Sequence, residues 1–326
     1  MTTIPPRAVL VELAVGTTPS SVPTVAEAAR IAAAAEAAGV TALRLVDELA
    51  DGAVLDPSVV AGFLGGMTTT LGYVVDVPTT RHAPYNSARR ILSLDRAVGG
   101  RAGVALRPGA GDEVSEAVAP DPAAADPVER WAEYADVLAR LWESFPAEAL
   151  VGDQDAEILA RDELIHPIAH AGRYYRVRGP LDGPSSVQGR PVQVVVDTDA
   201  IDVHRFAALA DVVVVDRERA AGYAAALAAA LAAVGRSRED VVLLGRVRLD
   251  RADLADPGTV GAVLAELDGW ASADGLDGFD LTGDDPLALV DLAGRLQPRG
   301  GATLRAAFGL PPVAARLAPV AREDVA

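Results

Sequence analysis

The stretch TLGYVVDVPTTRHAPYNSARRILSLDRAVGGRAGVALRP, residues 70–108, contains one complete strand–helix–strand unit. Residues 70–79 and 101–108 are short apolar runs, and each predicts a buried strand. The longer segment between them, residues 84–100, predicts a helix that ends at a pair of glycines. Near-continuous apolar strands joined by helices are typical of a parallel sheet that is buried on both faces.

The same alternation recurs along most of the chain. Residues 126–145 predict a strongly amphipathic helix, because aromatic and aliphatic residues return there at three- and four-residue steps. Eight strands, each followed by a helix, is the count of a (β/α)8 TIM barrel; a doubly wound sheet, the alternative, usually has fewer units. The predicted strands are 8–15, 42–48, 70–79, 101–108, 192–198, 211–216, 240–249 and 278–283, and the predicted helices are 24–39, 57–67, 84–100, 126–145, 201–210, 219–235, 259–275 and 287–296.

We expect a single barrel domain over residues 1–326. The alternation stops at residues 146–190, which we interpret as an insertion before the fifth strand, with a short strand or hairpin at 172–181. Residues 300–326 form a C-terminal tail. In a (β/α)8 barrel the functional site lies at the carboxyl ends of the strands.

Composition narrows the class of protein. The chain has 46 acidic and 29 basic residues, a formal net charge of −17, and such a surface repels nucleic acid and anionic lipid. It has no cysteine, which excludes disulfides, thiolate metal ligands and cysteine nucleophiles. The amino-terminal residues do not have the pattern of a signal peptide, and no apolar stretch approaches the length of a membrane span. We expect a cytoplasmic protein without a nucleic-acid or membrane partner.

Residues 79–109 resemble the signature region of the luciferase-like flavin-dependent monooxygenases, in which a Thr-Thr strand end precedes a Pro-Tyr helix and a Ser-Leu-Asp segment. Residues 170–194 are similar to the nitrilotriacetate and dibenzothiophene-sulfone monooxygenase branch, with its Gly-Pro-Leu and Gln-Gly-Arg-Pro-Val motifs. The segments 130–145, 277–283 and 303–312 match the branch as well. The matching signature residues are Thr79, Thr80, Pro84, Tyr85, Ala88, Arg89, Ser93, Leu94, Asp95, Gly100 and Arg101.

The resemblance implies an activity. Members are barrels, commonly dimeric, that use reduced FMN from a separate flavin reductase to activate oxygen and oxidise a small organic substrate. It implies that Asp47, Thr79 and Thr80 line the cleft for flavin and substrate, and that Thr198 and Asp199 lie where the FMN phosphate binds.

His82 follows the third predicted strand on the functional side of the barrel. It is our candidate catalytic acid or base, because histidine is the side chain that titrates most readily near neutral pH; the alternative is an ordinary loop residue. Asp47 is either a flavin- or substrate-positioning group or a solvated strand-end residue.

The phosphate junction departs from the family pattern. In VVVDTDAID, residues 194–202, Asp197 and Asp202 fall on family glycines and Asp199 falls on the serine that binds phosphate. A carboxylate 4 Å from a phosphate meets repulsion of about 4 kcal/mol at an effective dielectric constant near 20. The fourth strand lacks the family's Trp, Asn, Thr and Ser, and the excursion after the seventh strand is reduced to residues 250–258.

Other roles for these carboxylates remain open at the level of sequence. Asp199 or Thr198 is a candidate cap for the following helix. The three aspartates are a weak candidate for a divalent cation, since no histidine is adjacent, and we predict no metal site. Arg107 either receives an anionic substrate or pairs with this aspartate cluster.

Two hypotheses for function follow. The first is the family activity, FMN-dependent monooxygenation of a small organic substrate. The second is a non-catalytic barrel homologue that has lost canonical FMN binding, and therefore needs no cofactor of its own. It would act as a partner subunit or bind another small molecule. The oligomer would be a homodimer or a heterodimer with a homologue.

Overall fold

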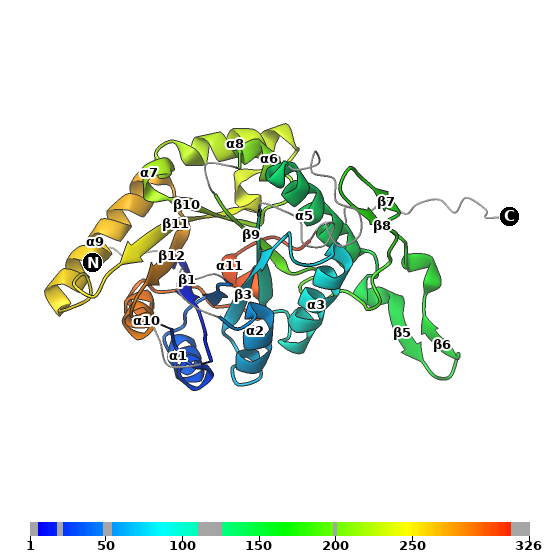
Figure 1. Ribbon diagram of the computed structural model, residues 1–326, viewed down its shortest axis with the longest axis horizontal. Coiled ribbons are helices and arrows are strands. Elements are labelled where there is room, and N and C mark those ends of the chain that lie inside the picture. Colours follow the sequence, from blue (N-terminus) through cyan, green and yellow to red (C-terminus); the bar gives the residue numbers. More distant parts are fainter. Residues whose placement is uncertain (1–5, 18–21, 48–53, 110–125, 198–200, 314–326) are drawn as a thin grey trace.

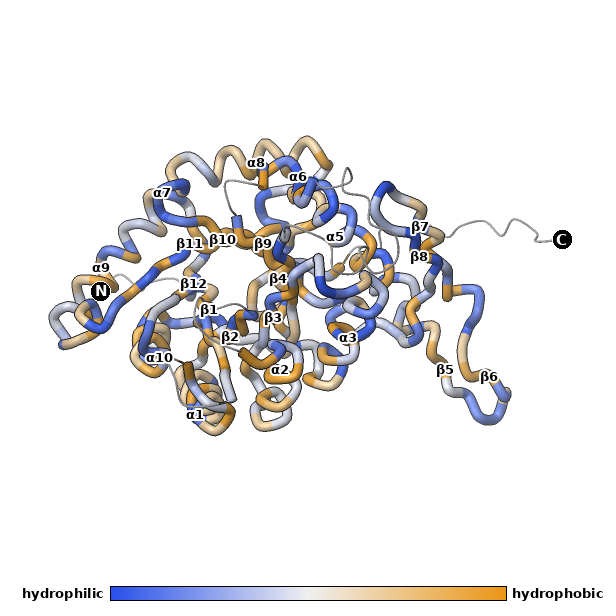
Figure 2. The backbone as a smooth tube through the Cα atoms, in the orientation of Figure 1, coloured by the Kyte–Doolittle hydropathy of each residue, from blue (hydrophilic) through white to orange (hydrophobic). Residues whose placement is uncertain are grey.

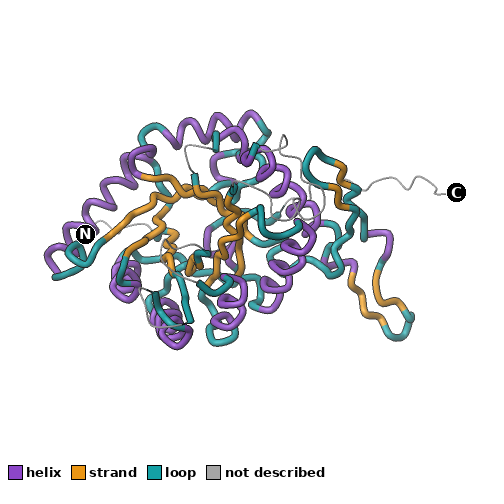
Figure 3. The backbone as a smooth tube through the Cα atoms, viewed as in Figure 1, coloured by secondary structure: helices purple, strands orange, loops and turns teal. Residues whose placement is uncertain are grey.

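A closed barrel of eight parallel strands forms the centre of the molecule, and helices surround it (Figures 1 and 3). The computed structural model describes residues 6–17, 22–47, 54–109, 126–197 and 201–313. The strands are neighbours in the order β1-β12-β11-β10-β9-β4-β3-β2, which confirms the predicted (β/α)8 barrel. They are β1 (Ala8–Leu13), β2 (Ala42–Leu45), β3 (Gly72–Pro78), β4 (Ala102–Arg107), β9 (Val192–Val196), β10 (Val212–Asp216), β11 (Val242–Leu249) and β12 (Gly278–Gly283).

Asp-Pro pairs begin several of the helices. The Asp56 carboxylate accepts the backbone N–H of Ser58 at 2.8 Å, and Pro57 occupies the first helical position, where a missing N–H costs nothing. The same pair begins α5, α9 and α10. The helices are α1 (Val25–Ala37), α2 (Pro57–Gly65), α3 (Pro84–Ala97), α5 (Pro127–Glu143), α6 (Val203–Phe206), α7 (Arg217–Ala220), α8 (Tyr223–Ala233), α9 (Pro257–Asp274), α10 (Pro286–Arg295) and α11 (Leu304–Phe308).

Two predicted helices differ from the structure. The helix predicted at 201–210 is only the four-residue α6. The helix predicted at 219–235 is divided into α7 and α8, because Gly222 has a φ of 73°, a left-handed conformation that interrupts a helix and suits glycine.

The insertion contains two small antiparallel hairpins. The first, β5 (Leu150–Asp153) with β6 (Ile158–Ala160), is absent from the sequence prediction. The second, β7 (His170–Ala171) with β8 (Arg176–Val177), lies at the predicted hairpin. The β5–β6 hairpin extends away from the barrel, and its tip is hydrophilic (Figures 1 and 2).

The barrel interior changes character along its axis. At the amino ends of the strands it is apolar, and α11 closes this end with the buried side chains of Leu304 and Phe308. Outside the barrel, α5 buries Trp131 and Trp142, whose indole N–H groups donate to the carbonyls of Leu106 and Ala88, both at 2.9 Å. Large buried aromatic side chains of this kind dominate core energetics. Within the described ranges, no helix is both long and apolar enough to cross a bilayer.

Candidate functional site

Charged side chains occupy the barrel interior at the carboxyl ends of the strands. Alternate residues of a strand face the same side. Ala8 and Leu10 belong to the interior cluster, so Glu12 also points inward. Every strand except β9 contributes such a charge, and β9 contributes Val196 instead. We call this set the ion-pair layer: Glu12, Arg44, Asp76, Arg107, Asp216, Arg246 and Asp280.

Arg44 is the centre of the layer. Its Nε and Nη2 donate to the two oxygens of Asp76 at 3.0 and 2.9 Å, a bidentate pair. Its Nη1 donates to Glu12 at 2.9 Å and to Asp280 at 3.1 Å. Burial acts to lower the pKa of Arg44, but these three carboxylates raise it by more, so the side chain stays charged.

The pairs continue to both sides of Arg44. On one side, Arg107 lies 3.4 Å from Asp76 and 3.9 Å from Asp47. On the other side, Arg246 lies 3.5 Å from Asp280 and 3.9 Å from Asp216. The chain of charges therefore crosses seven neighbouring strands. Arg107 thus pairs with Asp76 and Asp47, and its predicted pairing with the aspartate cluster at 197–202 stays a prediction, because Asp199 lies outside the described residues.

Carboxylates outnumber arginines in the layer. Glu12, Asp76, Asp216 and Asp280 face three arginines. Burial raises the pKa of Asp76 and of Glu12 despite their contacts with Arg44. Burial is the largest cause, and the neighbouring carboxylates add to it: Asp280 raises the pKa of Asp76, and Asp280 and Asp76 raise that of Glu12. The layer is therefore a poor receptor for a further anion.

A cleft of about 430 Å³ opens beside the layer. Arg217 stacks over the Trp270 ring at 5.2 Å in its wall. The β11–α9 connection is short, at 250–256, so no long excursion covers the opening. The lining residues are Glu12, Asp216, Arg217, Glu218, Arg246, Val247, Arg248, Trp270 and Thr282.

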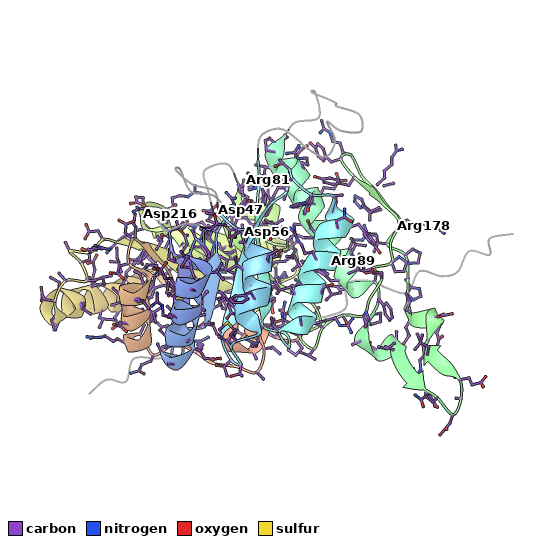
Figure 4. The ribbon with its side chains drawn as sticks, turned by 60° about the horizontal axis from the view of Figure 1, so that its bottom comes forward. Asp47, Asp56, Arg81, Arg89, Arg178 and Asp216 are labelled. Atoms are coloured by element: carbon purple, nitrogen blue, oxygen red, sulfur yellow. The ribbon has the colours of Figure 1, made fainter. Side chains whose placement is uncertain are left out.

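The residues predicted at the cofactor cleft lie together near β3 and β4. Asp47 pairs with Arg81 at 2.7 Å, and Figure 4 shows the two at the carboxyl ends of the strands. Thr79 is buried, and its hydroxyl donates to the carbonyl of Arg107 at 3.2 Å. Thr80 is buried too. The polar groups of Asp47 and Thr79 are thus held by protein contacts.

His82 lies partly buried in the loop between β3 and α3. Burial lowers the pKa of its imidazole, and the nearby Arg90 lowers it further. The Tyr134 hydroxyl donates to the His82 carbonyl at 3.0 Å and is hydrogen-bonded to the Ser87 hydroxyl at 2.6 Å, which holds the loop in place. A neutral imidazole in this position is able to accept a proton, so the assignment of His82 as an acid or base stays a prediction.

The β9–α6 junction uses its described carboxylates within the protein. Asp197 is buried and pairs with Arg219 at 2.9 Å. Asp202 is the N-cap of α6 and accepts the N–H of His204 at 2.9 Å. The helix cap is therefore Asp202, and the predicted cap at Asp199 or Thr198 is wrong. The site assignments of Thr198 and Asp199 fall outside the described residues.

These residues do not fit an FMN phosphate and ring. A phosphate at the junction would compete with Asp202 for an N–H of a helix only four residues long, whereas phosphate sites need free N–H donors. A flavin ring entering the barrel mouth would displace buried ion pairs, and a buried charge without its partner costs several kcal/mol. Among the described residues no metal-binding group of three side chains occurs either.

The prediction from sequence did not identify the centre of this site. Glu12, Arg44, Asp76 and Asp280 were not candidates, because each is a single charge within an otherwise apolar strand. That is also the signal that would have found them. A charge at an inward position near a strand's carboxyl end has only the barrel mouth to face.

Comparison with known proteins establishes the family. The family described as luciferase-like monooxygenase matches residues 8–250. One of the subunits of pristinamycin IIA synthase from Streptomyces pristinaespiralis is 30% identical over 286 residues, covering 86% of this chain and 87% of that protein. The chain belongs to the luciferase-like, flavin-dependent monooxygenase family.

Other relatives match a shorter region. Nitrilotriacetate monooxygenase component A from Aminobacter aminovorans is 34% identical over 143 residues. Dibenzothiophene-sulfone monooxygenase from Rhodococcus erythropolis is 31% identical over 144 residues. These alignments cover 43% and 42% of this chain, and 32% and 31% of the two relatives.

Solved structures share the fold. EDTA monooxygenase from Chelativorans sp. BNC1 superposes with a TM-score of 0.76 at 21% identity, over 94% of this chain and 99% of that one. A riboflavin lyase superposes with a TM-score of 0.79 at 20% identity, over 98% of each chain.

Proposed function

We propose that this chain is the non-flavin-binding subunit of a two-component monooxygenase. A homologous barrel in the same complex would bind reduced FMN, react with oxygen and oxidise a small organic substrate, and a separate flavin reductase would supply the reduced FMN. The ion-pair layer is the observation that carries this proposal, because it places buried charges where a flavin ring would enter the barrel.

Two further observations support a subunit role. The relative that aligns along most of its length is, by name, one of the subunits of a synthase. The β9–α6 junction directs Asp197 to Arg219 and Asp202 to the backbone of α6, so neither supports an anion.

An apolar stripe marks the surface where the partner barrel would dock. Val59 and Phe63 on α2, with Met67 just after it, are spaced four residues apart and are 67%, 51% and 59% exposed. The β5–β6 hairpin extends on the side of the barrel where α2 and α3 lie (Figure 1), and its Leu159 is 74% exposed. Exposed apolar residues gathered on one side of a molecule are typical of an interface between subunits.

FMN titration of the purified chain tests the proposal. We expect no saturable binding of oxidised or dithionite-reduced FMN up to millimolar concentration, measured by flavin fluorescence and by anaerobic calorimetry. An Asp199→Ser/Asp202→Ser variant, which keeps a capping oxygen at 202, separates the causes. It should remain unable to bind if the ion-pair layer excludes the ring, and should gain affinity if repulsion of the phosphate is the only obstacle. Binding by the unaltered chain at micromolar concentration would refute the proposal.

Complex formation is the second test. We expect the chain to co-purify as a heterodimer when co-expressed with a flavin-binding luciferase-like barrel of its source organism, as measured by light scattering after gel filtration. Phe63→Lys should abolish the heterodimer. Leu287→Lys, at a 49% exposed leucine on α10, is the matched control and should leave it intact. A monomer or homodimer in place of the heterodimer would contradict the subunit role.

The alternative function is the family activity in this chain alone. The 430 Å³ cleft favours it, because its lining combines acidic, basic and aromatic groups at the carboxyl end of the barrel. In that case Asp47, Thr79, Thr80 and His82, which lie outside the lining of this cleft, would contact the flavin and substrate from the β2 and β3 side of the barrel mouth. Reduced-FMN binding with oxygen-dependent product formation by the isolated chain, lost in His82→Ala, would establish this alternative.

A further inference from the structure

A second cavity lies outside the barrel, between the start of α3 and the β7–β8 hairpin. Its volume is about 630 Å³, within the range of small-molecule sites. Its Arg178 lies on the insertion side of the molecule, apart from Asp47 and Arg81 (Figure 4). The cavity is lined by Ala83, Pro84, Tyr85, Tyr174, Tyr175, Arg176, Val177, Arg178, Gly179 and Pro180.

Three tyrosines form the aromatic part of the lining. Tyr175 packs edge-to-face on Tyr134, with ring centroids 5.5 Å apart. The Tyr85 hydroxyl donates to the Pro180 carbonyl at 3.4 Å, and the Tyr174 hydroxyl donates to Glu129 at 3.1 Å. The rings are therefore held in position before any ligand arrives, which lowers the entropic cost of binding a planar molecule.

Two arginines provide the charge of the cavity. Arg176 and Arg178 are exposed, and no carboxylate of the described residues lies within salt-bridge distance of either. In a chain with 46 acidic and 29 basic residues, carboxylates are abundant, so two arginines left without a described acidic partner on one aromatic cavity give it a positive potential. Guanidinium groups bind carboxylates and sulfonates through parallel N–H donors.

The carboxylates next to the tyrosines already have partners. Glu133 accepts the backbone N–H groups of Tyr174 and Tyr175 at 3.0 and 2.9 Å and contacts His170 at 2.8 Å. Burial acts to raise the pKa of Glu133, but these donors lower it overall. Glu129 pairs with Arg173 at 2.9 Å. Both carboxylates of α5 are thus held by contacts of their own, and neither is an ion-pair partner of Arg176 or Arg178.

The cavity is coupled to the barrel mouth through one loop. Pro84 and Tyr85 closely follow His82, whose carbonyl accepts the Tyr134 hydroxyl. Tyr134 in turn packs on Tyr175 of the cavity. A ligand in the cavity would therefore contact the start of α3, and Arg81 and His82 lie in the loop directly before that helix.

We propose that this cavity is a binding site for a planar aromatic acid, with the tyrosine rings against the ring system and Arg176 and Arg178 on its carboxylate or sulfonate. The site is independent of whether the chain binds FMN, since it shares no lining residue with the barrel mouth.

Calorimetric titration of the full chain with 2-naphthoate tests this site. Uncharged 2-naphthalenemethanol, which keeps the ring system, is the comparison ligand. We expect saturable 1:1 binding of naphthoate, at least about tenfold tighter than the alcohol, because a charge-assisted bidentate pair adds to ring stacking. Equal affinity of the two compounds, or no saturable naphthoate binding at millimolar concentration, would overturn the proposal.

Variants locate the binding. Arg176→Gln/Arg178→Gln should weaken naphthoate binding about tenfold or more and leave the alcohol unchanged. Tyr174→Ala should weaken both compounds, since it removes a stacking surface. Arg161→Gln, at an exposed arginine of the same insertion outside the lining, is the control and should change neither. Undiminished naphthoate binding by the double arginine variant, with the fold intact by circular dichroism, would refute the site.

Discussion

Two buried aspartates at opposite ends of the barrel each face two arginines, yet their pKa values move in opposite directions. Asp211, at the amino end of β10, lies 2.9 Å from Arg190 and 2.9 Å from Arg305. Burial acts to raise its pKa, but the arginines and a backbone N–H lower it to about 2. Asp76, at the carboxyl end, faces Arg44 and Arg107, and its pKa is raised.

The difference lies in how the arginines are shared. Arg44 also serves Glu12 and Asp280, so Asp76 receives only part of its charge. Asp211 also accepts the N–H of Gln193 at 2.9 Å, which favours its ionised form. The amino end is thus a satisfied structural cluster, while the carboxyl end keeps surplus negative charge. The functional site of a (β/α)8 barrel lies at the carboxyl ends of its strands, and in this molecule that is also the end with the surplus charge.

Replacement of Arg44 should have the largest effect on stability. Arg44→Met should lower the free energy of unfolding by about 4 kcal/mol, because it leaves three carboxylates in the barrel without their shared partner. Urea denaturation followed by circular dichroism measures this. Arg248→Met, at an arginine with 78% side-chain exposure, is the control and should change stability by less than about 0.5 kcal/mol. A small effect at Arg44 would mean that the ion-pair layer is solvated.

The second largest effect on stability is expected at the amino end of the barrel, from replacement of Asp211. Asp211→Asn should lower stability at pH 7 by about 3 kcal/mol, since it leaves Arg190 and Arg305 buried with less counter-charge. Because the folded pKa of Asp211 lies below its ordinary value of 3.8, its contribution is present above pH 4 and is lost as the pH falls towards 2. The difference between variant and unaltered protein should therefore shrink over that interval in urea denaturation. A pH-independent difference would contradict the assigned pKa.

Asp202 differs from Asp76 and Asp211, because no arginine of the described residues pairs with it. Its replacement should therefore have a smaller effect on stability. Asp202 is exposed and caps α6 through the His204 N–H. Asp202→Ala should cost about 1 kcal/mol, and Asp202→Ser, which keeps a capping oxygen, should cost little. Thermal unfolding of the two variants measures the contrast. Equal losses would show that the negative charge, and not the cap, is what the junction needs.

Replacement of Glu12 should have the smallest effect, and this effect should be an increase in stability. Glu12 is partly buried and burial raises its pKa, so its ionised form opposes folding. Its contribution is greatest below the ordinary pKa of 4.5 and is lost as the pH rises through the folded value. Glu12→Gln should therefore increase stability at pH 7, on the order of 0.5 kcal/mol, with no gain at pH 4. A loss of stability at pH 7 would indicate that Arg44 needs this third carboxylate.

The β9–α6 junction shows the limit of prediction from sequence. Its run of aspartates indicated that the phosphate ligands of the family are replaced, and this needed only the motif alignment. The structure added what those carboxylates do: Asp197 meets Arg219, and Asp202 caps a helix. An aspartate that caps a helix cannot be told from one that forms a buried ion pair by sequence, because each is an aspartate that follows an apolar strand.

The sequence by itself determined the barrel. Apolar runs of strand length, helices that begin at Asp-Pro pairs and the order of the two are local properties, and local periodicity is enough to establish them. It also predicted the family, since the signature at residues 79–109 is contiguous.

Only the tertiary structure decided what the barrel mouth contains. Glu12, Arg44, Asp76 and Asp280 come from four strands, and Arg44 and Asp280 are 236 positions apart. The parallel register sets Glu12 beside Arg44, and closure of the barrel between β1 and β12 brings Asp280 to the same group. Periodicity shows that each charge faces inward, but only register and closure determine which charges meet.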